Sequence, residues 1–205
     1  MATVTIPLRE FSPLVYANLH ELEVVKNWTN AYSQTISELN KIIQGYGVGD
    51  MLGVALLHKH FNLHEDELLV REIEEDGIKI SPFNLQKNPV LPFIWAFSKS
   101  KVNECFGCYP IEFVRDHPDL RRFDVAANAV ATTASFRADY FRVLASDGAT
   151  NVLGLGLNVG ALYAFKPGHQ LMETESATRG ARTLRLQIRP EAEFEGKDVI
   201  QTLWI

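Results

Sequence analysis

Several stretches of this sequence alternate apolar residues with small or polar ones, and this two-residue period restricts the fold more than any other feature. In LGLGLNVGALYAF, every second residue from Leu153 to Phe165 is apolar, whereas Gly154, Gly156 and Gly160 lie on the opposite side. The runs FIWAF and TLRLQIR have the same period. Successive side chains of a strand point to opposite faces of a sheet, so these runs predict strands. LMETE and TLRLQIR are expected to form a hairpin with its turn near Arg179.

Two longer stretches have a helical period instead. From His20 to Gly47, and again from Asp119 to Ala145, apolar residues recur at steps of three and four. Such stripes are typical of amphipathic helices. Strands that follow one another in sequence favour antiparallel pairing, so the predicted fold class is α+β, an antiparallel β-sheet covered on one face by two long helices. The stripes consist of Leu22, Val25, Trp28, Tyr32, Ile36, Leu39, Ile42 and Ile43, and of Phe123, Ala126, Val130, Thr133, Phe136, Tyr140 and Leu144.

Size and charge narrow the classes of function. The 205 residues suit a single globular domain, residues 1–205, which can bury a core without disulfides. The net charge is -5 and no block of Lys and Arg stands out, so we expect no nucleic-acid partner. The sequence has neither a signal-peptide pattern nor an apolar stretch of about 18 residues. We therefore expect a cytoplasmic protein with no membrane partner.

The segment GVALLHKHFNLHEDE, residues 53–67, places three of the six histidines within seven positions. If the strand expected at GVALL continues, His58 and His60 point to the same side. If the segment is a helix, His60 and His64 share a face at a four-residue spacing that suits metal binding. The short apolar run after a glycine favours the strand.

Two imidazoles on one strand face are compatible with three roles. Most commonly, such histidines are structural and hydrogen-bond to neighbours on a half-buried face. A second role is general acid–base catalysis with a carboxylate that orients the imidazole, for which Glu173 and Glu175 in LMETE are candidates. A third role, which we do not favour, is a divalent metal site at His58 and His60. The candidate catalytic residues are therefore His58, His60 and Glu175, and Glu173 is a candidate ligand-binding residue.

The stretches GDMLGVALLHKHFNLHEDELLV, PIEF and METE resemble a group of filamentous-fungal proteins of uncharacterised activity. That group carries a Leu-His-x-His-Phe segment followed by Glu-x-Leu-Val, and a late region with Glu and Thr. The resemblance implies a role for His58, His60 and Glu67 and a fungal source. It implies no particular reaction.

Two other motifs have less support. Cys105-Phe-Gly-Cys108 matches the pattern of redox and zinc sites, but YPIEFV after it predicts a strand rather than the helix N-terminus of a redox site. A zinc site would need further ligands from elsewhere in the chain, so the favoured interpretation is that the two cysteines have no joint function.

Gly154, Gly156 and Gly160 have the spacing of a phosphate loop, but the helix that follows such a loop is not expected here. They leave room for a close neighbour, either the second helix, which is favoured, or a ligand.

The favoured hypothesis is an enzyme that acts on a small organic metabolite in a His/Glu pocket between the helices and the sheet, by acid–base or metal-assisted chemistry. Trp95 and Tyr163 would form walls of this pocket, and Arg179 would bind an anionic group of the ligand. The alternative is a non-catalytic protein that binds a small ligand or forms a homodimer.

Overall fold

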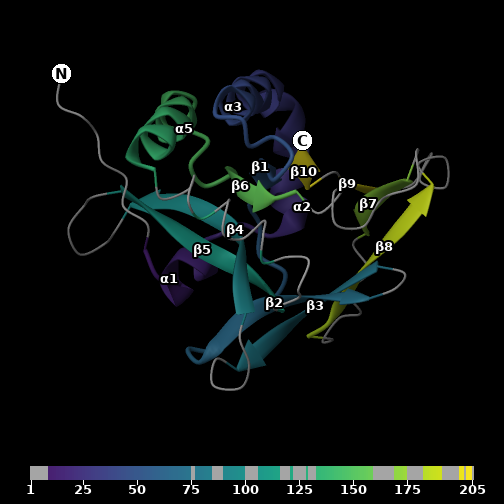
Figure 1. The fold of residues 1–205 in the computed structure, drawn as a ribbon. Helices are drawn as coiled ribbons and strands as arrows, with labels where there is room; N and C mark the ends of the chain where they lie inside the picture. The colour runs from purple at the N-terminus through teal and green to yellow at the C-terminus, as the bar shows by residue number, and fades with distance from the viewer. Residues whose placement is uncertain are drawn as a thin grey trace.

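The runs with a two-residue apolar period form the strands of a mixed, curled sheet (Figure 1). The computed structural model describes residues 9–74, 77–84, 90–99, 106–115, 121, 128, 133–158, 169–174, 182–190, 199–200 and 202–204. For residues 169–174, 187–190 and 199–200 it describes the backbone alone.

The described strands are hydrogen-bonded in the order β10-β1-β6-β4-β5-β2-β3-β8-β7-β9. β2 and β5 pair in parallel, and the other neighbouring strands pair antiparallel. The expected pairing of LMETE with TLRLQIR is confirmed as β7 against β8. The strands are β1 (Leu52–Leu56), β2 (Glu67–Glu74), β3 (Gly77–Asn84), β4 (Val90–Lys99), β5 (Phe106–Arg115), β6 (Leu153–Leu157), β7 (His169–Thr174), β8 (Leu184–Pro190), β9 (Val199–Ile200) and β10 (Leu203–Trp204).

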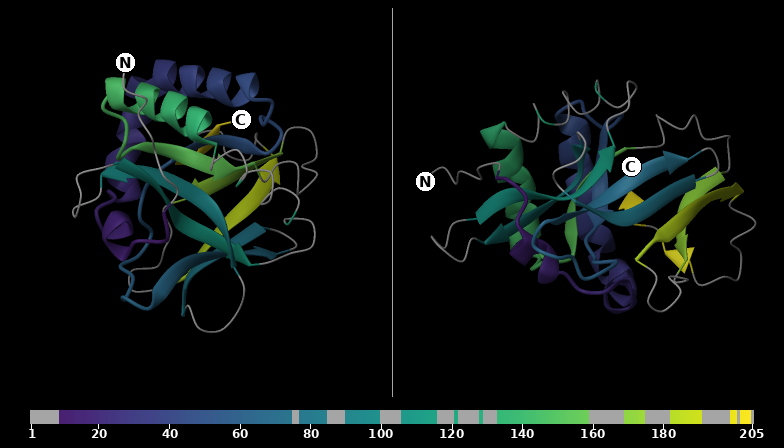
Figure 2. Two further views of the ribbon diagram at one scale, coloured as in Figure 1. Left: turned by 60° about the vertical axis from the view of Figure 1, so that its left-hand side comes forward. Right: turned by 90° about the horizontal axis from the view of Figure 1, so that it is seen from below.

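The two main helices, α3 (Ser33–Gly45) and α5 (Ala134–Ser146), lie side by side over one end of the sheet (Figure 2). Their apolar stripes face the core, as the periodicity predicts: Leu39 and Tyr140 are fully buried. None of the helices in the described part of the chain combines the length and apolar character that crossing a lipid bilayer requires. The shorter helices are α1 (Pro13–Ala17), α2 (Leu22–Val25) and the 3-10 helix η1 (Lys26–Tyr32).

The prediction of an antiparallel sheet covered by two long helices is wrong. The parallel β2–β5 pair makes the sheet mixed, and the sheet curls into a half-barrel. The first predicted helix is divided into α2, η1 and α3. Side chains in η1 bond to the backbone, as the Thr29 hydroxyl does with Lys26 O at 3.1 Å, and such bonds compete with regular helix. Most of residues 119–132 of the second predicted helix lie outside the described residues. The α+β class therefore fits only loosely.

Cross-strand registers divide the sheet into two faces. Val54, Leu155 and Trp95 are partners on β1, β6 and β4 and share one face. Phe97, two residues beyond Trp95, stacks on Tyr140 of α5, with ring centroids 5.3 Å apart. This face is therefore the one that the helices cover.

The opposite face carries Gly53, Gly156 and Ile94, which are partners on β1, β6 and β4. Ile94 is also the partner of Glu112 in β5, and the register of β4 with β5 shifts on both sides of Ile94. A Cβ atom at Gly53 would lie 2.4 Å from the carbonyl oxygen of Trp204 in β10. The missing side chains let neighbouring strands approach closely, which is how glycine permits a sheet to bend.

The space beside Gly154 and Gly156 is filled by the sheet's own residues. A Cβ at Gly154 would lie 2.3 Å from the carbonyl oxygen of Trp95 and 2.5 Å from a Leu57 methyl, and one at Gly156 would lie 2.9 Å from a Leu203 methyl. Helix α5 contacts Gly154 in a different way, because the Tyr140 hydroxyl donates to the Gly154 carbonyl at 2.7 Å. Gly160 lies outside the described residues.

Gly53→Ala is expected to lower the free energy of unfolding by about 1–3 kcal/mol, because the methyl group must displace the β10 backbone. Gly45→Ala is the matched control: no atom lies within 4 Å of its Cβ position, so its effect is expected to stay within about 1 kcal/mol of zero. Urea unfolding followed by circular dichroism measures both. Equal stability of the two variants would contradict close packing at Gly53.

Candidate functional site

The two histidines after β1 lie side by side. Residues 57–64 contain no helix, so the alternative in which His60 and His64 share a helical face is wrong. The expected strand ends earlier, because β1 stops at Leu56 and His60 lies in a bend. Between the two histidines, Lys59 N–H donates to His20 O at 2.8 Å, and Lys59 forms an isolated parallel bridge with Glu21. The imidazole rings of His58 and His60 meet edge to face, with centroids 4.5 Å apart.

A hydrogen bond to the backbone orients the ring of His58. Its Nδ1 lies 2.9 Å from the carbonyl oxygen of Leu56, and the side chain is almost completely buried. Because a carbonyl only accepts, this bond requires a proton on Nδ1, and the neutral ring then has Nε2 as its acceptor.

His60 faces a buried ion pair. Its Nε2 lies 3.5 Å from Oε1 of Glu112, while Oε2 of the same carboxylate accepts a 2.6 Å hydrogen bond from Nε of Arg71. The exposed fractions of the His60, Arg71 and Glu112 side chains are 3%, 4% and 1%. A separation of 3.5 Å is at the long limit for a hydrogen bond, so the bond between His60 and Glu112 is weak. We call these three residues with His58 the histidine–carboxylate cluster.

Burial and neighbouring charges act in opposite directions on Glu112. Burial alone raises the pKa of a carboxyl group, but the Arg71 guanidinium and the His60 imidazole outweigh it and lower the pKa of Glu112 from 4.5 to about 2. Glu112 is therefore ionised at neutral pH, and it favours a positive charge on the imidazole beside it.

The curl of the sheet assembles this cluster from distant strands. β1 and β5 are separated by β6 and β4, so a flat sheet would hold them about 14 Å apart at the usual strand spacing. Arg71 comes from β2, next to β5, and its guanidinium lies 4.9 Å from the centre of the Phe93 ring in β4. The hydroxyl of Tyr16 in α1 accepts the His60 backbone N–H at 3.1 Å and thus fixes the chain at the histidine.

Sequence reasoning missed Arg71 and Glu112 as members of the site. Glu112 is a lone charged residue inside the buried run Gly107–Val114 of β5, whereas Arg71 ends the buried run Leu68–Arg71 of β2 and is followed by Glu72. A lone charge inside an apolar run is rarely stable without a partner, and this signal could have identified Glu112.

The other predicted site residues have different outcomes. Trp95 is fully buried, and its partner Leu155 places it on the helix-covered face, opposite Gly53 and Gly156. The backbone of Glu173 pairs with Ile200 between β7 and β9. Tyr163, Glu175 and Arg179 lie outside the described residues.

Glu67, to which the fungal resemblance gave weight, connects two segments of the chain. Its carboxylate accepts a 2.9 Å hydrogen bond from Arg182 and a 2.8 Å bond from the His64 backbone N–H. Arg182 also donates to Asn62 O at 3.0 Å. The bond from Arg182 is the main reason that the pKa of Glu67 is lowered. Glu67 thus attaches the histidine segment to the start of β8.

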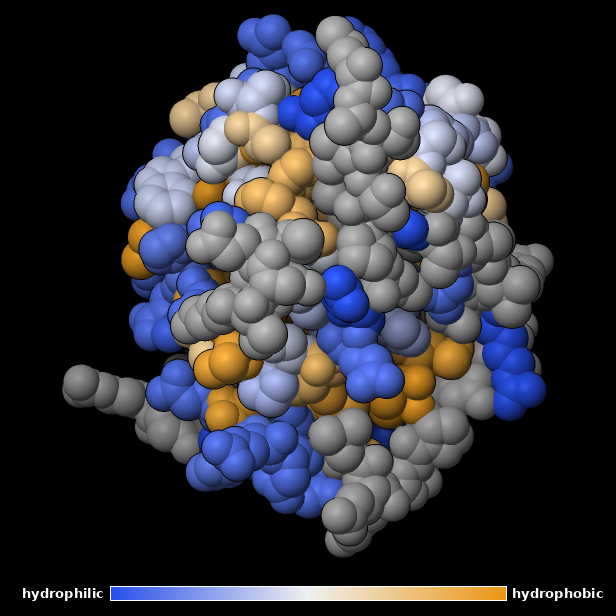
Figure 3. All heavy atoms as spheres, turned by 90° about the vertical axis from the view of Figure 1, so that its left-hand side faces the viewer, coloured by the Kyte–Doolittle hydropathy of each residue, from blue (hydrophilic) through white to orange (hydrophobic). Residues whose placement is uncertain are grey.

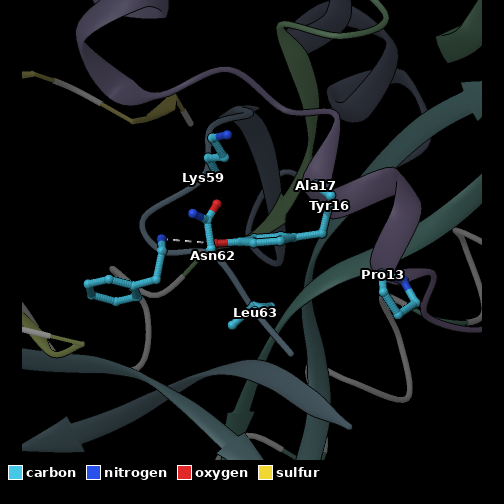
Figure 4. A pocket seen from close by; sticks show the side chains of 7 residues that line it. Pro13, Tyr16, Ala17, Lys59, Asn62 and Leu63 are labelled. Atoms are coloured by element: carbon cyan, nitrogen blue, oxygen red, sulfur yellow. Dashed lines mark hydrogen bonds between the residues drawn. The ribbon is translucent and has the colours of Figure 1, made fainter. Parts of the chain in front are cut away.

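A small hollow adjoins the histidine segment (Figure 4). Pro13 and Ala17 of α1 line it together with Lys59 and Leu63, and the Tyr16 ring lies between these two groups. Its volume of about 50 Å³ is well below the roughly 300 Å³ at which small-molecule pockets begin. This hollow holds a few water molecules at most.

Cys108 lies on β5 and is fully buried, and its burial raises the pKa of the thiol to about 12. A protonated, inaccessible thiol neither binds zinc nor attacks a disulfide. Cys105 lies outside the described residues.

Among the described residues, no group of three or more His, Cys, Asp and Glu side chains has an arrangement that could hold a metal ion. In the cluster, one carboxylate oxygen of Glu112 is already engaged by Arg71.

The comparisons provide no relative. No family model, no curated protein and no solved structure matches this chain.

Glu112→Gln is expected to lower the free energy of unfolding at neutral pH by about 3–5 kcal/mol, because it leaves the Arg71 charge buried without a counter-ion. The double variant Arg71→Met/Glu112→Leu removes both charges and is expected to regain most of this loss. Denaturant unfolding of the three proteins is the measurement, and a fully stable Glu112→Gln variant would contradict the ion pair.

The ionised Glu112 carboxylate should also make the free energy of unfolding depend on pH in the acid range. The folded-state pKa of Glu112 lies below its ordinary value, so its contribution of about 3 kcal/mol is complete above roughly pH 4.5 and is lost as the pH falls towards 2. Unfolding free energies measured across this window should therefore fall more steeply for the wild type than for Arg71→Met/Glu112→Leu. Parallel curves would show that Glu112 does not titrate in this way.

Cys108 is expected to resist iodoacetamide in the folded protein at about pH 8, because almost none of the thiol is ionised and the side chain is inaccessible. Mass spectrometry of peptides with and without denaturant measures the modification. Rapid alkylation of Cys108 in the folded protein would contradict its placement.

Proposed function

We propose that this protein is an enzyme that acts on a small organic molecule by proton transfer, with His60 as the group that accepts and returns the proton. The observation that carries the proposal is the buried arrangement in which His60 faces the ionised Glu112, which Arg71 holds from the other side. Buried ionisable groups with a strongly shifted pKa and specific charge partners are frequent at active sites.

The proposed chemistry uses the imidazole of His60 as the proton carrier, because Nε2 of this ring faces the ionised carboxylate of Glu112. The resulting imidazolium would be stabilised by the carboxylate, in the way that a carboxylate supports the histidine of a catalytic triad. The same proton would then return to a different atom of the substrate. Such an isomerisation is balanced and needs no further reactant.

The surroundings support an organic substrate rather than an ion. Phe93 and Phe61 lie beside the cluster, with the Phe61 ring centre 6.2 Å from that of His60 and the Phe93 ring against Arg71. Apolar walls with a few polar groups are the usual lining of small-molecule sites. His58, whose ring contacts that of His60, is proposed to orient His60 rather than to react.

The experiment is a metabolite screen by thermal shift, followed by NMR of each stabilising compound for proton rearrangement or exchange with D2O. His60→Gln is expected to bind such a compound and to convert it at least about 100-fold more slowly, the usual contribution of a general acid–base group. His64→Gln is the matched control, because His64 is exposed in the same segment and contributes its backbone N–H to Glu67.

Conversion at an unchanged rate by His60→Gln would refute the role of this residue. Binding without conversion by the wild type would instead support the alternative, a non-catalytic protein that binds a small ligand.

The homodimer alternative has little support on the face in Figure 3, where apolar side chains are interspersed with hydrophilic ones. The exposed large apolar residues of the described part, such as Leu14, Val24 and Ile73, come from different elements.

A further inference from the structure

Arg71 has more hydrogen-bond donors than partners. Its side chain is almost completely buried, and within the described part of the chain its guanidinium makes one hydrogen bond, from Nε to Glu112 at 2.6 Å. A guanidinium carries five N–H groups, so the four on Nη1 and Nη2 have no acceptor among the described residues. Buried donors without an acceptor are destabilising, so these four call for a partner from elsewhere.

The two terminal nitrogens border accessible space. In the described part of the chain, the unbonded polar side-chain atoms that are completely enclosed do not include Nη1 or Nη2 of Arg71, so both nitrogens keep some accessible surface. Arg182 differs, because it is exposed and still uses both terminal nitrogens, which donate to Glu67 and to Asn62 O. The outer edge of Arg71 is therefore available to an acceptor from outside the chain.

The neighbours of Arg71 fix the plane of its guanidinium. Glu112 binds Nε, and the guanidinium carbon lies 4.9 Å from the centre of the Phe93 ring. The edge formed by Nη1 and Nη2 takes no part in the bond to Glu112. Two parallel N–H donors on one edge match the two oxygens of a carboxylate and bind them with a pair of hydrogen bonds.

This edge belongs to the same cluster as His60. Nε of Arg71 and Nε2 of His60 face the two oxygens of one carboxylate, that of Glu112. The register partners of Arg71 are Ile80 in β3 and Val114 in β5, and both are buried. An anion bound at Arg71 therefore needs an apolar body rather than further charges.

Charge balance favours a ligand with a single negative charge. Among the described residues, the histidine–carboxylate cluster contains one guanidinium, one carboxylate and two imidazoles. With neutral imidazoles, the charges of Arg71 and Glu112 cancel. A bound monoanion is then balanced when His60 takes up one proton, whereas a doubly charged phosphate group would leave a buried charge without a counter-ion.

From these observations we propose that Nη1 and Nη2 of Arg71 bind the carboxylate of a small monocarboxylic acid with an apolar body. That this acid is the substrate class of the reaction at His60 rests on the proposed function. The binding itself can be measured without any turnover.

The test titrates the wild-type protein with formate, acetate and benzoate and follows the arginine side chains in proton–nitrogen NMR correlation spectra. The Arg71 signal is identified by its loss in Arg71→Lys. At least one of the three acids is expected to shift this signal saturably, whereas formamide, acetamide and benzamide, which lack the charge, leave it in place. No saturable shift with any of the acids, or an equal shift with the matching amide, would overturn the proposal.

Variants of two ion pairs locate the site. Arg71→Met/Glu112→Leu is expected to weaken binding of the acid at least about tenfold, because it removes the paired donors. Arg185→Met/Glu74→Leu is the matched control: it removes an exposed ion pair of the same residue types, also on β2, and is expected to leave the affinity unchanged. Backbone amide shifts give the dissociation constants. Equal affinities of Arg71→Met/Glu112→Leu and the wild type would overturn the proposal.

Arg71→Lys keeps the test decisive if the double variant does not fold, because it retains the positive charge beside Glu112. Its affinity for the acid is expected to fall at least about fivefold, since an ammonium group lacks the paired donors. An unchanged affinity, or displacement of the acid by an equimolar amount of inorganic phosphate, would overturn the assignment. Binding at Arg71 without conversion in the metabolite screen would refute the proposed enzyme activity and leave the carboxylate site standing, so the two failures are distinguishable.

Discussion

The close approach of strands β1, β6, β4 and β10 at glycine positions is the constraint on which the rest of this structure depends. A side chain at Gly53 or Gly154 would collide with the backbone of a neighbouring strand. Without these side chains the sheet curls, and the curl brings His60, after β1, to Glu112 on β5. The same glycines leave the space that Leu203 fills. The charged cluster therefore depends on the close packing of the strands at these glycines.

The charged cluster itself is costly to bury, and its members stabilise one another. Glu112 remains ionised because Arg71 and His60 compensate for the loss of water around it. A purely structural ion pair would need only Arg71 and Glu112. The additional contact of the carboxylate with His60, and of His60 with His58, is what distinguishes this arrangement and motivates the proposed proton transfer.

Part of the fold and part of the site could be predicted from local pattern. The helical stripes around Leu39 and Tyr140 and the alternating run at Leu153–Leu157 correspond to α3, α5 and β6. The strand β1 also followed from the short apolar run at GVALL, but it ends at Leu56 and does not continue through His58 and His60. The length of the first helix could not be predicted in this way, because Asn27 and Thr29 of η1 form side-chain bonds to the backbone there. Trp95 was expected as a wall of a pocket between the helices and the sheet; the register of β4 with β6 places it on the helix-covered face, where it is fully buried.

By itself, the sequence indicated where several strands and the cores of the two main helices lie, because period and spacing act between near neighbours. Only the tertiary structure decided that β1 pairs with β6 and β10, about a hundred residues or more away, and that β2 pairs in parallel with β5. It also decided that Arg71 and Glu112, rather than the acidic residues of LMETE, are the described charges beside His60. The reason is physical: pairing partners and charge partners are selected by the burial of the whole sheet, which no local pattern encodes.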